Sequence, residues 1–193
     1  VSLQLRILYD LLELDLLSSN YIQCDETPVQ VLKEENRKAT TKSYMWVRGR
    51  SGEKPIVLFK YAPSRSGETA KSMLQNFKGF LQVDGYGGYN GVCNIDGITR
   101  IGCLYHVRRK YHDSLKSSKL GKKIADRALK IIQTISVEDE KIHTLPMAER
   151  MQAKEAKVRP LLEKLKALVD ENIKILPPKT KIGEAMLYTI NEW

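Results

Sequence analysis

Two aspartates in this chain end the same short pattern, in which a glutamine lies two residues before the acid at the end of an apolar run. The pattern occurs as Gln23-Cys24-Asp25 and again as Gln82-Val83-Asp84. An ionised carboxylate among apolar strand residues is costly unless a cation or hydrogen bonds compensate its charge. Mg²⁺ and Mn²⁺ prefer oxygen ligands, so the repeated pattern indicates a site for a hard divalent cation.

Two such acids suit in-line attack on a phosphodiester. Two divalent ions held about 4 Å apart activate the attacking oxygen and stabilise the leaving oxygen, so no protein nucleophile is needed. Each aspartate alone has a plainer interpretation, because an acid at a strand end often starts a turn, as in Asp84-Gly85. Glu26 is expected on the strand face opposite Asp25, since side chains alternate along a strand. We therefore predict that Asp25 and Asp84 are the metal ligands and the catalytic acids.

The elements that must position these acids follow from the spacing of apolar residues. Leucines at helical intervals predict a helix over residues 3–17, and a second helix is expected at 64–77. Short apolar runs are typical of strands. They lie at residues 21–27, 44–48, 56–61, 80–84 and 98–104. A proline at position 28 is expected to end the first run, and the chain beyond about residue 105 has a helical pattern.

This order of elements is that of the RNase H-like fold, in which the first and fourth strands lie side by side. We predict an α/β protein with a mixed five-stranded sheet and flanking helices, followed by a helical insertion. The expected divisions are an N-terminal helix packing on the core at 1–19, the core at 20–112, and a helical tail at 113–193. In this fold, Asp25 and Asp84 meet at one edge of the sheet.

Positive charge is concentrated in one part of the chain. The net charge is +9, and ten Lys and Arg residues lie between Arg100 and Lys130 against two acids, Asp113 and Asp126. Such a block is the footprint of a polyanion, because binding phosphates releases condensed counterions. A solvated helix face is the plainer explanation. The basic block follows a predicted metal site, which favours nucleic acid as the partner.

Cysteine content and apolar runs bear on the environment of the protein. The three cysteines are widely spaced and have neither zinc-knuckle spacing nor the number expected of a disulfide framework. They indicate a reducing, cytoplasmic setting. The longest apolar runs are only a few residues, so we expect no membrane span.

Four stretches strongly resemble transposases of the insertion-sequence-sixty-six family, which have an Asp-Asp-Glu catalytic triad. They are Asp-Glu-Thr-Pro-Val-Gln-Val-Leu at 25–32, Tyr-Ala-Pro-Ser-Arg-Ser-Gly at 61–67, Leu-Gln-Val-Asp-Gly-Tyr-Gly-Gly-Tyr-Asn at 81–90 and Gly-Cys-Leu-Tyr-His-Val-Arg-Arg-Lys-Tyr at 102–111. The resemblance implies a bacterial-type polynucleotidyl transferase that cuts and joins chromosomal or plasmid DNA at transposon ends, using Mg²⁺ or Mn²⁺.

The resemblance also assigns the acids. Asp25 matches the first acid of the family and Asp84 the second. The third, a glutamate, lies in the family beyond the stretch matched by residues 188–193, where this chain stops. We therefore expect the two-metal site to be incomplete here and the isolated fragment to be inactive.

Six residues near the acids and in the basic block are candidate DNA contacts: Tyr86, Tyr89, His106, Arg108, Arg109 and Lys110. The two tyrosines flank a Gly-Gly pair and suit stacking on unpaired bases, although packing of the turn is the commoner explanation. The four others open a basic helix, where arginine offers bidentate phosphate contacts. A zinc site at Cys103 and His106, with His112 nearby, lacks an obvious fourth ligand.

Two other functions stay open at this point. A nuclease or resolvase of the same fold would share both acids. A non-catalytic DNA-binding or assembly module would use only the charge in the helices after Arg100. The tail carries an apolar stripe at Leu161, Leu162, Leu165 and Leu168, which is either a helical packing unit or an element forming a homo-oligomer.

Overall fold

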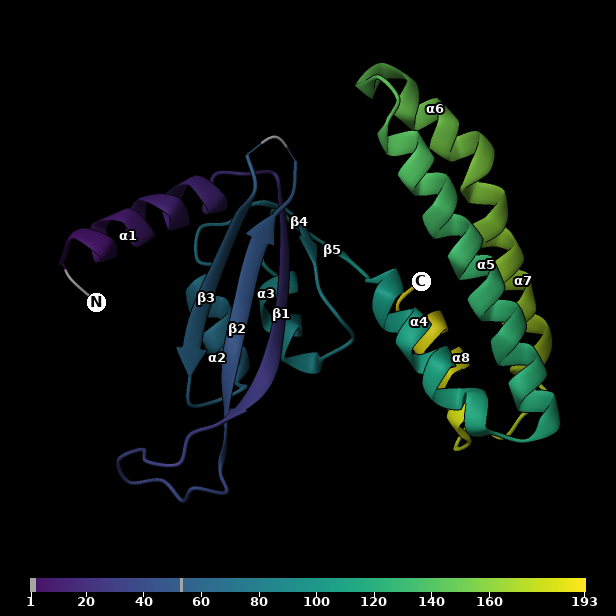
Figure 1. The fold of residues 1–193 in the computed structure, drawn as a ribbon, viewed down its shortest axis with the longest axis horizontal. Coiled ribbons are helices and arrows are strands. Elements are labelled where there is room, and N and C mark those ends of the chain that lie inside the picture. Colours follow the sequence, from purple (N-terminus) through teal and green to yellow (C-terminus); the bar gives the residue numbers. More distant parts are fainter. Residues whose placement is uncertain (1–2, 53) are drawn as a thin grey trace. The chain divides into compact units, whose positions relative to one another are not determined.

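The computed structural model describes residues 3–52 and 54–193, and the chain divides into two compact units between Gly102 and Cys103. The first unit contains a sheet with helices, and the described residues of the second form helices and connecting turns (Figure 1). The predicted division at residues 112 and 113 stays a prediction. Residues 1 and 2 of its N-terminal segment lie outside the described residues.

The described residues form five strands of one sheet: β1 (Tyr21–Gln30), β2 (Lys42–Arg50), β3 (Ile56–Ala62), β4 (Gly79–Gln82) and β5 (Ile98–Ile101). Their order is β3-β2-β1-β4-β5. β2 is antiparallel to both β1 and β3, whereas β4 is parallel to both β1 and β5. The first and fourth strands are therefore neighbours. This confirms the predicted α/β fold with a mixed five-stranded sheet, which is the arrangement of RNase H-like proteins.

The first strand is longer than predicted. It continues through Pro28 to Gln30, and Pro28 pairs with Tyr44 of β2. The register of β4 covers only Tyr21–Gln23, so the part of β1 that contains the proline has its strand neighbour on one side. A missing N–H is tolerated in such a position. The predicted end of the strand before Pro28 was wrong for this reason.

One hydrophobic core joins the sheet to the helices of the first unit. These helices are α1 (Leu3–Leu17), which has the predicted bounds, α2 (Gly67–Met73) and α3 (Asn90–Cys93). Figure 1 shows α2 and α3 behind the sheet. Along β1, Ile22, Cys24 and Glu26 are buried on the core face, so Asp25 lies on the opposite face.

The second unit is built on a long helix. Its helices are α4 (Leu104–Asp113), α5 (Lys119–His143), α6 (Met147–Lys157), α7 (Arg159–Asn172) and α8 (Lys181–Asn191). Ser118 caps α5, since its hydroxyl accepts a hydrogen bond from the N–H of Gly121 at 3.2 Å. Leu165 and Leu168 of the predicted apolar stripe are buried in the core of this unit. The stripe is therefore accounted for by packing among helices.

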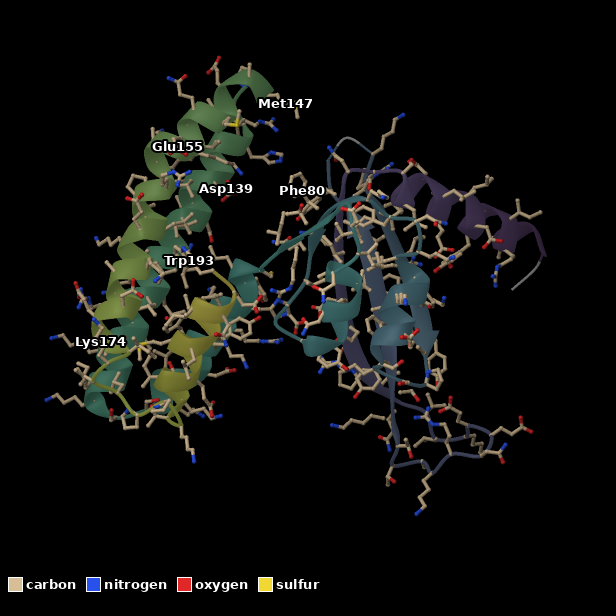
Figure 2. All side chains as sticks on the ribbon, turned by 180° about the vertical axis from the view of Figure 1, so that it is seen from behind. Phe80, Asp139, Met147, Glu155, Lys174 and Trp193 are labelled. Carbon is tan, nitrogen blue, oxygen red and sulfur yellow. The ribbon has the colours of Figure 1, made fainter. Side chains whose placement is uncertain are left out.

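Prolines lie at two of the breaks between these helices. α5 and α6 are separated around Pro146, and α7 and α8 around Pro177 and Pro178. Met147 and Lys174 lie toward opposite ends of the unit (Figure 2). Within the described ranges, none of the helices combines the length and the apolar character needed to cross a membrane.

Candidate metal centre

The parallel register of β1 and β4 brings the two Gln-x-Asp patterns side by side. Gln23 is the partner of Gln82 across the ladder. Each aspartate follows its glutamine by two residues, so the same register places Asp25 and Asp84 next to each other at one edge of the sheet. A carboxylate oxygen of Asp25 lies within 4.8 Å of one from Asp84. The structure thus joins the two predicted acids through one local register.

The two glutamines hold this register with their side chains. The Gln23 amide donates to the Gln82 Oε1 at 2.8 Å, and the Tyr21 hydroxyl donates to the same oxygen at 2.5 Å. The Gln82 amide nitrogen donates to the carbonyl of Gly102 at 3.3 Å. The hydrogen bond between Gln23 and Gln82 therefore links β1 to β4, and the one from Gln82 to Gly102 links β4 to the residue that follows β5. Each glutamine lies two residues before its acid.

Backbone amides orient both carboxylates. The N–H of Glu26 donates to Asp25 Oδ1 at 2.8 Å, and the N–H of Tyr86 donates to Asp84 Oδ1 at 3.0 Å. The guanidinium of Arg100 donates to the main-chain carbonyl of Asp84 at 2.9 Å, which fixes the backbone just beyond β4. These contacts restrict both side chains before any ligand binds.

The donor set fits a hard divalent cation. Both carboxylates are partly buried, and two negative charges this close repel each other unless a cation balances them. Arg65 supplies one positive charge, with its Nη2 at 3.9 Å from Asp84 Oδ2, but this guanidinium also binds Glu26. Two carboxylate oxygens this close suit Mg²⁺ or Mn²⁺ better than a soft metal.

Glu26 lies behind the acids in a buried network that the sequence analysis did not identify. Its side chain is fully buried, Arg65 contacts it at 2.5 Å, and the Tyr89 hydroxyl donates to it. Burial raises the pKa of Glu26, against the effect of these two partners. The only signal for Arg65 in the sequence was its place in the stretch 61–67, which resembles the family.

The turn after Asp84 packs against Arg65. The Arg65 guanidinium lies 3.7 Å from the centre of the Tyr86 ring, and the Tyr86 hydroxyl donates to the Arg65 carbonyl at 2.5 Å. A Cβ on Gly88 would come within 2.2 Å of the Tyr86 ring, so glycine is needed for the ring to fold back. Tyr89 is fully buried. Its predicted stacking on DNA is wrong, because a buried ring presents no face to a base.

The other candidate DNA contacts lie in α4, in the second unit. Arg109 and Lys110 are exposed, Arg108 is partly exposed and His106 is buried. The Lys110 ammonium lies 5.3 Å from the centre of the Tyr188 ring. Among the described residues, no group of metal ligands contains Cys103, so the zinc alternative has no support from the geometry.

Comparisons with known proteins agree with this geometry. A family model described as "Transposase IS66 family" matches residues 1–193. Uncharacterized protein y4jD of Sinorhizobium fredii (strain NBRC 101917 / NGR234) is 27% identical over 98% of this chain and 39% of its own length. Uncharacterized protein y4qI of the same organism is 26% identical over 86% of this chain and 33% of its own length. The chain spans less than two fifths of the length of these relatives. No solved structure gives a significant match.

Proposed function

The chain belongs to the transposase IS66 family, and from this premise we propose that its first unit carries the metal-binding acids of a DNA transposase. Asp25 and Asp84 bind Mg²⁺ or Mn²⁺ for the cleavage and transfer of DNA strands at transposon ends. The observation that supports this most directly is the register of β1 and β4, which holds the two carboxylates within 4.8 Å of each other.

The residues of the site divide the work between binding and orientation. When bound, a divalent ion polarises the scissile phosphate and activates the attacking oxygen. Asp25 and Asp84 supply oxygen ligands to it, and the N–H of Tyr86 keeps the Asp84 carboxylate oriented. Arg65 forms an ion pair with Glu26, a third carboxylate, which lies on the core side of β1.

DNA is the partner that the charge of the second unit supports. The exposed side chains of Arg109 and Lys110, with Arg108 beside them, form a basic helix surface that contacts phosphates. Such contacts hold a duplex without reading its sequence. Tyr86 remains a candidate for a DNA contact beside the acids, whereas His106 is buried and is a weaker candidate.

Manganese binding tests the proposal without requiring catalysis. We expect Asp25→Asn and Asp84→Asn each to weaken Mn²⁺ binding by at least about tenfold in calorimetric titration, since even groups that only orient metal ligands contribute this much. Asp96→Asn is the matched control, because it removes the same charge from an exposed position of the first unit. Equal Mn²⁺ affinity in the wild type and in both site variants would refute the metal centre.

A further inference from the structure

The first half of α5 carries a row of cations along one side. Its five members are exposed: Lys119, Lys122, Lys123, Arg127 and Lys130. With 3.6 residues per turn, this spacing confines them to an arc of about 140°. Ile124, Ala128 and Ile131 on the other side are buried in the core of the second unit. We refer to these five residues as the α5 basic stripe.

The stripe is not balanced by acidic partners. Within residues 3–52 and 54–193, no acid lies in ion-pair contact with any of the five cations. Asp126 is the one acid in this stretch, so five cations and one acid leave a local charge of +4. Several other cations of the same unit do have acidic partners. Lys154 binds Asp139 at 2.7 Å, and Glu155 contacts Arg159 (Asp139 and Glu155 in Figure 2).

This placement of charge works against the stability of the helix. Lys119 and Lys123, like Lys123 and Arg127, are four residues apart, and like charges at this spacing repel each other. The first turn of α5 contains no acid, so its lysines also oppose the positive end of the helix dipole. Asp126 lies four residues from both Lys122 and Lys130 and offsets part of these unfavourable terms. A polyanion bound to the stripe would offset the rest.

We propose that the α5 basic stripe binds the phosphate backbone of duplex DNA. The inference rests on the proposed function for the identity of the partner. From Lys119 to Lys130 the helix rises about 16 Å, which matches about five phosphates of one strand. A membrane surface is disfavoured, because the apolar side of α5 is buried and cannot enter a bilayer.

A charge-matched pair of variants tests the stripe. In the first, Lys122→Gln, Lys123→Gln and Arg127→Gln are combined, since glutamine keeps the helix propensity. Binding to a generic duplex is measured by fluorescence anisotropy in EDTA over a range of salt concentrations. We expect the slope of log affinity against log salt to become shallower by about 2.7, at about 0.9 per lost phosphate contact, with binding at least about tenfold weaker.

The control removes the same charge from paired cations of the same unit. It combines Lys141→Gln, Lys154→Gln and Lys181→Gln, whose acidic partners lie at 2.6, 2.7 and 3.0 Å. This variant should keep nearly the wild-type slope. Equal slopes in the two triple variants would show that only net charge matters and would overturn the stripe.

Two further measurements separate the stripe from the metal centre and from other polyanions. The stripe variant should bind Mn²⁺ as the wild type does, whereas Asp25→Asn should keep its DNA affinity in EDTA. Absence of the stripe effect would leave the metal centre unaffected. Failure of the wild type to bind DNA at any salt concentration would count against both the stripe and DNA as the partner of this chain. Stripe-dependent binding to phosphatidylserine vesicles that equals or exceeds binding to DNA would reject DNA as the partner.

Discussion

Arg48 in the first unit is 1% exposed and binds three groups, whereas Lys123 in the second is exposed and has no acidic partner among the described residues. Arg48 donates to the carbonyl of Met73, to the Glu13 carboxylate and, at 3.5 Å, to the Tyr9 hydroxyl. It therefore ties α1 and α2 to β2. Lys123 makes no such link in its own unit.

The contrast teaches that the two units use charge for different purposes. A buried ion has lost its hydration, so its partners must compensate it and any loss of a partner is costly. An exposed cation keeps its hydration and can contact phosphates, which then release the counterions condensed on the nucleic acid. Buried charge in the first unit therefore fixes the geometry around the acids, and exposed charge in the second unit is available to a ligand.

The largest expected effect comes from deleting a buried cation. Arg48→Ala should lower the free energy of unfolding by about 3–5 kcal/mol, because it leaves Glu13 and the Met73 carbonyl without their partner. Lys123→Ala should change it by no more than about 0.5 kcal/mol. Urea denaturation followed by the fluorescence of Trp46, which is buried in the first unit, measures the first effect directly. Similar losses of unfolding free energy in both variants would contradict the difference between the buried and the exposed cation.

Two fully buried tyrosines give a finer test of the same contrast. Tyr89 donates to the Glu26 carboxylate, whereas the Tyr111 hydroxyl accepts from Thr189 Oγ1 at 3.1 Å. Burial raises the pKa of Tyr89, so it stays protonated and remains a donor. Hydrogen bonds to charged groups contribute more than neutral ones.

Tyr89→Phe should therefore cost about 1.5–3 kcal/mol of stability and Tyr111→Phe about 0.5–1.5 kcal/mol. Trp46 fluorescence reports unfolding of the first unit, and the helical circular dichroism signal follows the second. A larger loss of stability in Tyr111→Phe than in Tyr89→Phe would mean that the hydrogen bond to the Glu26 carboxylate does not contribute more than the neutral one.

The sequence predicted the strands from short-range patterns, and the meeting of the acids from the order of elements, in which the first and fourth strands are neighbours. Asp25 and Asp84 end matching patterns, and two strands that pair in parallel through Gln23 and Gln82 must carry both acids to one edge. The alternation along β1 also predicted Glu26 on the face opposite Asp25, which the structure confirms and shows to be the core face.

The surroundings of the acids could not be predicted in the same way. Tyr89 and Arg65 meet Glu26 only because α2 and the turn after β4 come together on the core face, and no local pattern encodes that approach. Gly67 and Gly88 show how close it is, since a Cβ on Gly67 would lie 2.8 Å from the Gly88 carbonyl oxygen. The sequence left base stacking and turn packing both open for the tyrosines, because the packing of this turn is decided by residues distant in sequence.

The smallest expected effect, and the one that separates the units by sign, is in pH dependence. Burial raises the pKa of Glu26 above its ordinary value of 4.5, a shift opposed by hydrogen bonds from Tyr89 and Arg65 and increased by the nearby charge of Asp84. The folded protein therefore holds this proton more tightly than the unfolded chain. Its contribution to stability is present below about pH 4.5 and is lost as pH rises through the raised pKa.

Glu26→Gln removes this titration, so the stability of the variant relative to wild type should increase as pH rises from about 4 to 7. Glu138 in α5 is the opposite case, because a hydrogen bond from Lys141 lowers its pKa. The contribution of Glu138 to stability is present above its ordinary pKa and is lost as pH falls. Glu138→Gln should therefore become less stable relative to wild type as pH rises from about 4 to 7. Thermal unfolding at several pH values measures both trends. Trends of the same sign would mean that burial does not govern Glu26, and that the acids of the two units are held in the same way.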